Sequence, residues 1–158
     1  MANPATSNLD PMDCSILMEL QWNARITFAE IGRRVGLSTP AIIERVRRLE
    51  ESGVIEGYHA QINPAKVGLS VRAMIKISIA GERLAQFAAV AQKVPEVLEC
   101  HRVTGSESFI LQIAATDVLH MEKIIDKLMP YVATNTSIIL ASPVSWSPIV
   151  PPQDQGPR

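Results

Sequence analysis

The sequence has few aromatic residues, little cysteine and no long apolar run. Aromatic residues make up 4% of the 158 residues, so a core must be built mainly from Ile, Leu, Val, Met and Ala. Cys14 and Cys100 are the only cysteines, which argues against a disulfide framework and is typical of a reducing compartment. No apolar run reaches the roughly 20 residues of a membrane helix, and the first residues do not resemble a secretory signal. We therefore expect a cytoplasmic protein.

An excess of charge of one sign is also missing. The formal net charge is −1, and hydrophobic residues make up 47% of the chain, as in an average globular protein. This balance does not exclude a nucleic-acid partner, because affinity for phosphates depends on where arginines and lysines lie on the surface.

No spacing in the chain indicates catalysis or metal binding. His59, His101 and His120 lie far apart, and none has a partner at metal-ligand spacing. Cys100 and His101 are neighbours in a predicted strand, so their side chains should point to opposite faces. The serines of residues 105–108 do not form a nucleophile elbow, because no helix follows them. We predict no catalytic residue, no metal and no cofactor.

Residues 10–53 contain the pattern of three helices. Asp10 can cap the first, whose apolar face we assign to Met12, Ile16 and Leu20. Thr27 and Glu30 form a capping box that starts the second helix, which buries Ile31 and Val35 and ends at Gly36. Ser38 caps the third helix, and its Ile42, Val46 and Leu49 should face the core.

Two short helices joined by a tight turn form a helix-turn-helix, whose second helix enters the major groove of DNA. Arg45 could read a guanine and Glu44 could accept from a cytosine, or Glu44 could pair with Arg48 on the helix surface. The other arginines more naturally reach phosphates. The candidate DNA-binding residues are Arg33, Arg34, Ser38, Thr39, Pro40, Ala41, Glu44, Arg45, Arg47 and Arg48.

The rest of the chain predicts a short wing and a second domain. Residues 54–62 alternate like a wing or β-ribbon, so the DNA-binding domain should span 9–62, with a linker at 63–68. Residues 69–142 predict a ferredoxin-like βαββαβ domain with both helices on one face of the sheet, which makes the whole chain α+β. The elements are strands at 69–79, 97–103, 109–115 and 136–142, and helices at 84–94 and 119–128, the latter stopped by Pro130.

Two further features concern assembly. An open sheet face carrying apolar residues would need a second subunit to cover it, and two-fold pairing suits a palindromic DNA site. The proline-rich tail at 143–158 should be a loose arm or a strap over a neighbouring subunit, with disorder expected for its last residues.

The sequences GRRVGLS at 32–38 and ERVRRLEESGVIEGY at 44–58, followed by the βαββαβ pattern, resemble the Lrp/AsnC family over residues 9–140. The resemblance implies a winged helix-turn-helix that binds double-stranded DNA and a C-terminal regulation-of-amino-acid-metabolism domain. It also implies dimers that assemble into octamers or related forms, with amino-acid effectors bound between dimers.

One loop departs from the family pattern. The family's Gly-Asp-x-Asp-Tyr is here Gly105-Ser106-Glu107-Ser108-Phe109, so two carboxylates have become hydroxyls. A hydroxyl binds an ammonium group less strongly than a carboxylate does. The effector is therefore expected to be unusual, weakly bound or absent. The candidate effector residues are Gly105, Ser106, Glu107, Ser108, Thr134 and Thr136.

Three functions remain to be separated. The leading one is a transcription regulator tuned by a small effector, and the second is an architectural, nucleoid-type DNA organiser that has no effector. The third is a ferredoxin-like enzyme with an accessory domain, whose turnover would depend on His101 or Glu107.

Overall fold

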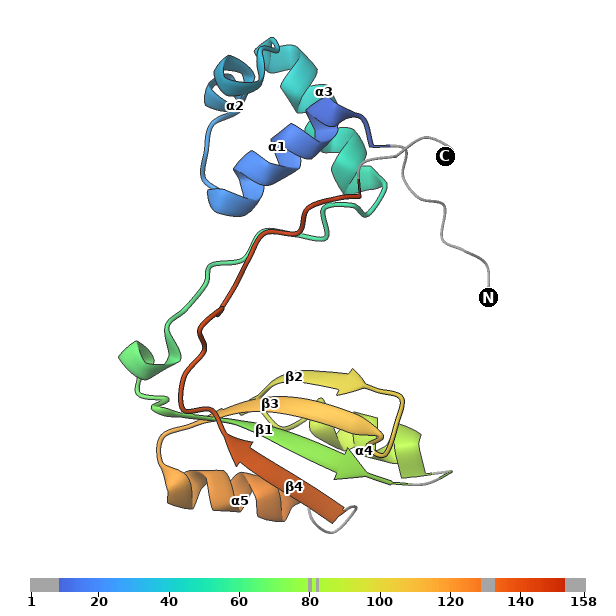
Figure 1. Cartoon of the computed structure of the whole chain (residues 1–158), viewed down its shortest axis with the longest axis vertical. Coiled ribbons are helices and arrows are strands. Elements are labelled where there is room, and N and C mark those ends of the chain that lie inside the picture. Colours follow the sequence, from blue (N-terminus) through green and yellow to red (C-terminus); the bar gives the residue numbers. More distant parts are fainter. Residues whose placement is uncertain (1–8, 80, 82, 129–132, 153–158) are drawn as a thin grey trace. The chain divides into compact units, whose positions relative to one another are not determined.

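The computed structural model describes residues 9–152 except 80, 82 and 129–132 (Figure 1). The chain divides into two compact units, Met1–Gln61 with Val144–Arg158, and Ile62–Pro143. The predicted linker at 63–68 therefore lies in the second unit. The tail belongs to the same unit as the N-terminal helices, although its residues 153–158 lie outside the described part of the chain.

Three helices form the N-terminal unit: α1 (Pro11–Trp22), α2 (Phe28–Val35) and α3 (Thr39–Glu51). They surround a core of Ile16, Leu17, Leu20, Ile31, Ile42, Val46 and Leu49. The predicted apolar face of α1 is wrong in one position, because Met12 is 36% exposed whereas Asp13 is 1% exposed. Positions 13, 16, 17 and 20 share one helical stripe, and Asp13 tolerates burial because two arginines pair with its carboxylate.

The predicted wing is absent. Residues 52–63 are all described, and they contain no strand. Val54 and Ile55 instead donate their backbone N–H groups to the Leu49 carbonyl, so the chain wraps the end of α3. A 3-10 turn, η1 (Pro64–Val67), follows and ends at Gly68. Alternation alone cannot make a ribbon when no second strand lies beside it to complete the hydrogen bonds.

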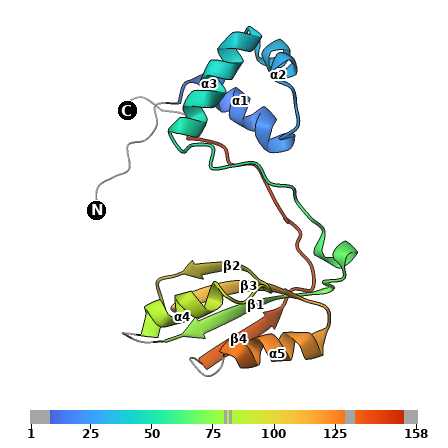
Figure 2. The same cartoon turned by 180° about the vertical axis from the view of Figure 1, so that it is seen from behind.

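The second unit is a four-stranded antiparallel sheet covered by two helices, as predicted. Its elements are β1 (Val71–Ser78), α4 (Arg83–Ala91), β2 (Val97–Arg102), β3 (Phe109–Ala115), α5 (Val118–Leu128) and β4 (Ala133–Ile138). The strand order is β2-β3-β1-β4, which is the ferredoxin-like arrangement. One core cluster contains β1, β3 and both helices, and Figure 2 shows α4 and α5 on the same side of the sheet.

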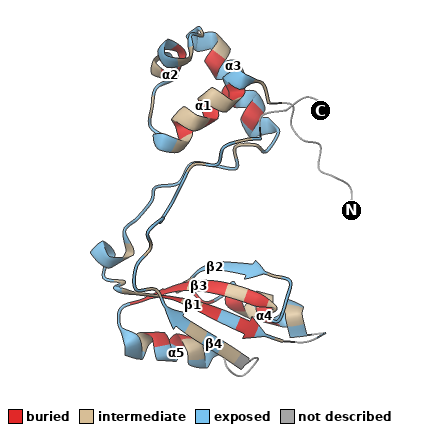
Figure 3. Cartoon of the chain, in the orientation of Figure 1, coloured by how far each residue is buried: buried red, intermediate tan, exposed pale blue. Residues whose placement is uncertain are grey.

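The face of the sheet without helices is largely polar. Arg72 and Lys76 of β1 lie there beside Gln112 of β3, with Met74 and Ile110 as apolar neighbours. The buried residues concentrate in β1 and β3, whereas the edge strands are mostly exposed (Figure 3). An apolar patch on this face therefore supplies less of a reason for dimerisation than the strand pattern indicated.

The last strand differs most from its predicted bounds. β4 spans Ala133–Ile138 rather than 136–142, because its pairing with β1 runs from Ser78↔Ala133 to Ala73↔Ile138. Pro130, the predicted stop of the preceding helix, lies outside the described residues. Among the helices that the structure describes, none has both the length and the apolar composition needed to cross a membrane.

Candidate nucleic-acid interface and effector loop

Local signals fix the ends of α2 and α3. Thr27 caps α2 and accepts from the backbone N–H of Glu30 at 3.2 Å, and Ser38 caps α3 by accepting from Ala41 at 3.4 Å. The capping box predicted at α2 is only half formed, since the Glu30 carboxylate accepts from Arg33 and Arg34. A complete capping box instead begins α1, where Asp10 and Asp13 each accept from the other's backbone N–H.

The turn between α2 and α3 depends on two glycines. Gly36 has φ 74°, a left-handed conformation that ends α2 as predicted. Gly32 lies inside α2, where an added Cβ would be 2.5 Å from the backbone oxygen of Leu37. The sequence pattern did not single out Gly32, because its role depends on how closely the turn folds back onto α2.

The exposed surface of α3 differs from the predicted one at Ile43. Thr39, Pro40 and Glu44 are exposed as expected, whereas Ala41 is half-buried. Ile43 is 47% exposed, and the predicted DNA-binding residues do not include it. Successive residues turn about 100° around a helix, so the neighbours Ile42 and Ile43 cannot both face the core. Two consecutive isoleucines in a helix therefore indicate that one of them is exposed.

The arginines on the exposed faces of α2 and α3 all pair with nearby carboxylates. Arg33 contacts Glu30, Arg34 contacts Glu19 and Glu30, and Arg47 contacts Glu44 and Glu51, at distances of 2.6–2.9 Å. The guanidinium groups of Arg33 and Arg34 lower the pKa of Glu30 to about 2, in that order. Arg47 likewise lowers the pKa of Glu44. Exposed pairs of this kind are weak and screened by salt, so phosphates can replace the carboxylates.

Arg45 has a different environment, in a cluster with α1. Its guanidinium lies 2.6 Å from Asp10 and 2.7 Å from Asp13, and Arg48 lies 2.9 Å from Asp13. The Arg45 side chain is 26% exposed, against 58% for Arg47. The backbone N–H of Asp13 and then Arg45 lower the pKa of Asp10. This cluster ties the start of α1 to the middle of α3.

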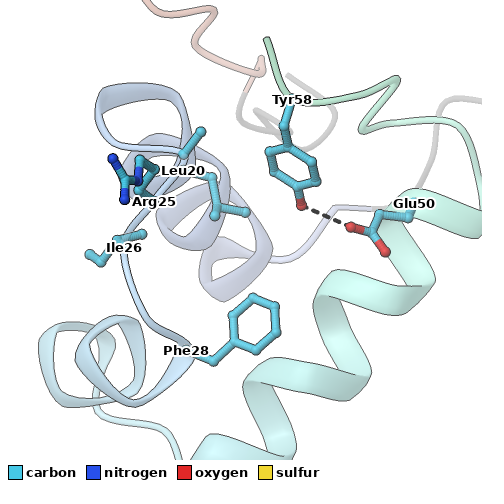
Figure 4. Close-up of a pocket in the computed structure, with 7 residues that line it drawn as sticks. Leu20, Arg25, Ile26, Phe28, Glu50 and Tyr58 are labelled. Carbon is cyan, nitrogen blue, oxygen red and sulfur yellow. Dashed lines mark hydrogen bonds between the residues drawn. The ribbon is translucent and has the colours of Figure 1, made fainter. Parts of the chain in front are cut away.

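Tyr58 anchors the start of the connecting segment on the N-terminal unit. Its hydroxyl donates to Glu50 at 2.8 Å (Figure 4). Burial, followed by this hydrogen bond, raises the pKa of Tyr58 to about 12. The ring lines a hollow of about 230 Å³ together with Leu20, Ala24, Arg25, Ile26, Phe28 and Glu50.

The predicted effector loop is fixed to the end of β1. The Ser108 hydroxyl donates to the Ile79 carbonyl at 2.6 Å and accepts from the Ile79 N–H at 3.1 Å. Ser108 N–H also donates to Ile77 at 2.7 Å. Ser108 thereby extends the pairing of β1 with β3, and its hydroxyl is already engaged within the domain.

Ser106 and Glu107 form the outer part of this loop. Ser106 donates to the Glu107 carboxylate at 2.7 Å, and this bond is the largest of the effects that lower the pKa of Glu107. Thr134 and Thr136 of β4 lie opposite Ile77 and Ile75 and are half-buried. Both sets of predicted effector residues therefore flank β1, and Gly105 (φ 118°) turns the loop.

The histidines have ordinary polar neighbours. His101 lies 3.0 Å from Glu99, on an exposed edge strand. His120 and Lys127 belong to α5. His120 lies 3.2 Å from the Glu96 carboxylate, and Lys127 lies 3.1 Å from the same carboxylate. Over the described residues, no group of three or more His, Cys, Asp or Glu side chains could hold a metal ion.

Comparisons with known proteins match two family models to the chain, one after the other. Residues 9–50 match the AsnC-type helix-turn-helix domain, and residues 72–149 match the Lrp/AsnC ligand binding domain. The chain is 32% identical over 133 residues to the transcriptional regulator LrpC of Bacillus subtilis, covering 84% of this chain and 92% of that protein. It is 38% identical over 125 residues to the leucine-responsive regulatory protein of Salmonella typhimurium, covering 77% and 76%.

A similar solved structure is the complex of a transcriptional regulator from Neisseria meningitidis with L-Met. The two structures have a TM-score of 0.84 at 33% identity, over 89% of this chain and 96% of that one. Two matching domains in the expected order, and relatives above 30% identity over most of the chain, show the same family. The chain belongs to the Lrp/AsnC family of DNA-binding transcription regulators.

Proposed function

We propose that this regulator reads base edges with the exposed stripe Thr39, Pro40, Ile43 and Glu44 at the start of α3. The observation that carries the proposal is the capped N-terminus of α3, whose exposed side chains include an apolar one suited to a thymine methyl group. Ser38 and the half-buried Ala41 shape this end of the helix.

Phosphate binding belongs to the arginines held only by exposed pairs, namely Arg33, Arg34 and Arg47. Arg48 is 59% exposed, so it can reach a phosphate while it stays near Asp13. We assign Arg45 a positioning role rather than a base contact, because its guanidinium is paired with both Asp10 and Asp13.

Full-length protein and a duplex obtained by in vitro selection test this assignment. Ile43→Ala should relax the preference at one base position, whereas Arg47→Ala should weaken all sequences about equally. Arg47→Ala should also reduce the slope of log affinity against log salt by about 1. Arg102→Ala, on β2, is the matched control, because it removes the same charge from an exposed residue of the other unit. Equal losses for Arg47→Ala and Arg102→Ala would exclude Arg47 as a phosphate contact.

For the effector, we propose an amino acid at the outer part of the 105–108 loop. Two similar structures are complexes with L-methionine. Glu107 supplies a carboxylate that its neighbours keep ionised, whereas the Ser108 hydroxyl is engaged with Ile79. Because this loop has lost two carboxylates relative to the family pattern, we expect weak binding.

Calorimetric titration with L-methionine, followed by the other amino acids, tests this proposal. The expected result is weak binding that Glu107→Gln reduces by about tenfold, as when one charge-assisted bond of roughly 1.4 kcal/mol is lost. Glu122→Gln, at an exposed position of α5, is the control, because it removes one carboxylate outside the loop. Tight binding of leucine or alanine that is unchanged in Glu107→Gln would contradict the proposal.

We further propose that the working form is a homodimer able to assemble further, to an octamer or a related form. Two copies would present two recognition helices to a palindromic site. Exposed apolar side chains near the end of β4, with Ile138 46% and Leu140 95% exposed, offer surface for a second copy. Sedimentation velocity should give a dimer or larger, and Leu140→Ser should shift the distribution toward smaller species.

A further inference from the structure

The C-terminal segment lies on the helix-turn-helix unit of its own chain. The Gln21 side chain makes two bonds with the backbone of Ile149: its amide nitrogen donates to the carbonyl at 3.0 Å, and its amide oxygen accepts from the N–H at 2.7 Å. Trp146 meets Trp22 with ring centroids 5.4 Å apart and planes at 81°. Such edge-to-face pairs are favourable. The tail was predicted to be a loose arm or a strap over a neighbouring subunit, whereas here residues 146 and 149 contact α1 of the same chain.

A short piece of chain separates this contact from the sheet. Ile139 donates its N–H to the Arg72 carbonyl at 2.8 Å, and the Arg72 side chain donates to the Ser142 hydroxyl at 2.8 Å. Only residues 143–145 lie between that bond and Trp146. The other connection leaves the N-terminal unit at Tyr58 and reaches β1 at Val71. The two units are thus joined twice by the chain, and one of the two joints is short.

We propose that Gln21 and Trp22 form a docking surface for residues 144–150, and that the docked segment is a second tether holding the DNA-binding unit. The inference rests on the proposed function, a regulator whose DNA binding responds to an effector at the second unit, and the predicted effector residues Thr134 and Thr136 lie on β4. β4 runs directly into the tether, so a change at the effector site reaches α1 through a few residues. A domain joined by one connection moves freely relative to its neighbour, whereas a second short anchor restricts its orientation.

The contact can open as well as close. Trp22 is 66% exposed and Trp146 45% exposed, and the Gln21 bonds join neutral groups. Such a contact can be broken without unfolding either core, because neither tryptophan belongs to the buried clusters. The tether therefore restricts the orientation of the recognition helices without contributing to their fold.

Domain motion gives a test that does not involve DNA. Amide nitrogen relaxation of the full-length protein should report the same tumbling time for both units in the wild type. Gln21→Ala and Trp146→Ala should each shorten the tumbling time of the helix-turn-helix unit alone. Ile149→Ala is the matched control, because the Ile149 side chain is 77% exposed and only its backbone meets Gln21. Unchanged tumbling in both variants overturns the tether.

DNA binding tests the consequence. On duplexes with two half-sites, the wild type and Ile149→Ala should lose about tenfold in affinity when the spacing changes by half a helical turn, about 5 base pairs. Gln21→Ala and Trp146→Ala should bind the best spacing within about threefold of the wild type and lose most of this preference. If both variants retain it, the coupling role is wrong. A wild type that binds no duplex contradicts the proposed function instead, and the relaxation result still decides the tether.

Mixed oligomers separate a tether within one chain from one supplied by a second copy. Co-expressed Gln21→Ala and Trp146→Ala chains have no intact contact if each tail docks on its own α1. A contact between chains would restore one intact site in every mixed pair, and the slow tumbling with it. That recovery would overturn the assignment of the docked segment to the same chain.

Discussion

Asp13 is 1% exposed, and its carboxylate accepts from Arg45 and Arg48. Removing one member of a buried ion pair leaves the other charge uncompensated, which costs about 3–5 kcal/mol. Asp13→Asn keeps the volume and loses the charge, and Arg45 still reaches solvent and Asp10. We therefore expect a loss near the lower end, about 3 kcal/mol, in urea unfolding.

Asp10→Asn is the control for this prediction. An asparagine still caps α1, and the pair that it loses is one whose aspartate side chain is 43% exposed. It should cost less than about 1 kcal/mol. Equal losses from both substitutions would show that the Asp13 charge has no special role in holding α3.

Glu30 gives the DNA-binding unit a dependence on pH. Its pKa falls from 4.5 to about 2 through hydrogen bonds from Arg33 and then Arg34. Because the folded pKa lies below the unfolded one, the stabilisation is complete above about pH 4.5 and is lost as pH falls toward 2. Glu30→Gln should therefore flatten the fall in melting temperature across this window. The difference should shrink in high salt, because salt screens exposed pairs.

At the scale of elements, the turn between α2 and α3 needs a glycine for two different reasons: Gly32 for space and Gly36 for its backbone conformation. Gly32→Ala would push a Cβ against the Leu37 carbonyl, and such overpacking costs about 1–3 kcal/mol. Gly36→Ala meets no atom within 4 Å, but its φ of 74° costs about 1 kcal/mol. Urea unfolding should show both losses.

DNA affinity at a temperature where both variants are folded should separate these two glycines. Gly32→Ala moves the turn and should lower affinity, whereas Gly36→Ala should not. Gly36→Asn should recover stability, since asparagine also adopts this conformation. A Gly32→Ala variant with wild-type stability and affinity would contradict the close approach.

Elements with local signals were predictable from sequence. Thr27, Ser38 and Gly36 mark helix ends through neighbours a few residues away, and the structure confirms each. Features set by distant partners were not predictable in this way. The predicted wing did not form, because in the described part of the chain no second strand lies beside residues 54–62. The bounds of β4 differ from the prediction, because its pairing with β1 fixes its register.

The candidate site follows the same rule. Helical periodicity predicts most of the exposed stripe of α3, but it cannot show that the Arg45 guanidinium pairs with Asp10, which lies 35 residues away. Sequence spacing likewise cannot show that the Ser108 hydroxyl is bonded to the Ile79 carbonyl, because the two residues are 29 positions apart. Residue types and spacing indicate which side chains could act, while tertiary partners decide which are already engaged.

At the scale of the whole molecule, two separate cores are joined through the linker and the C-terminal segment. One core lies among α1, α2 and α3, and the other between the sheet and the helices α4 and α5. The sequence indicated two domains, but not the return of the tail to the first one. The side chain of Ile149 could not indicate this contact, because it is 77% exposed and the backbone of Ile149 makes the hydrogen bonds with Gln21.

Two independent cores should unfold as two transitions. Phe87 is fully buried, with its ring centroid 5.1 Å from that of Phe109, so Phe87→Ala should cost the sheet domain about 3–5 kcal/mol. In calorimetry of the full-length protein, it should lower one transition and leave the other in place. Asp13→Asn should do the reverse, because Asp13 packs only within the helical unit. A single transition that both substitutions shift together would mean that the two units unfold as one cooperative body.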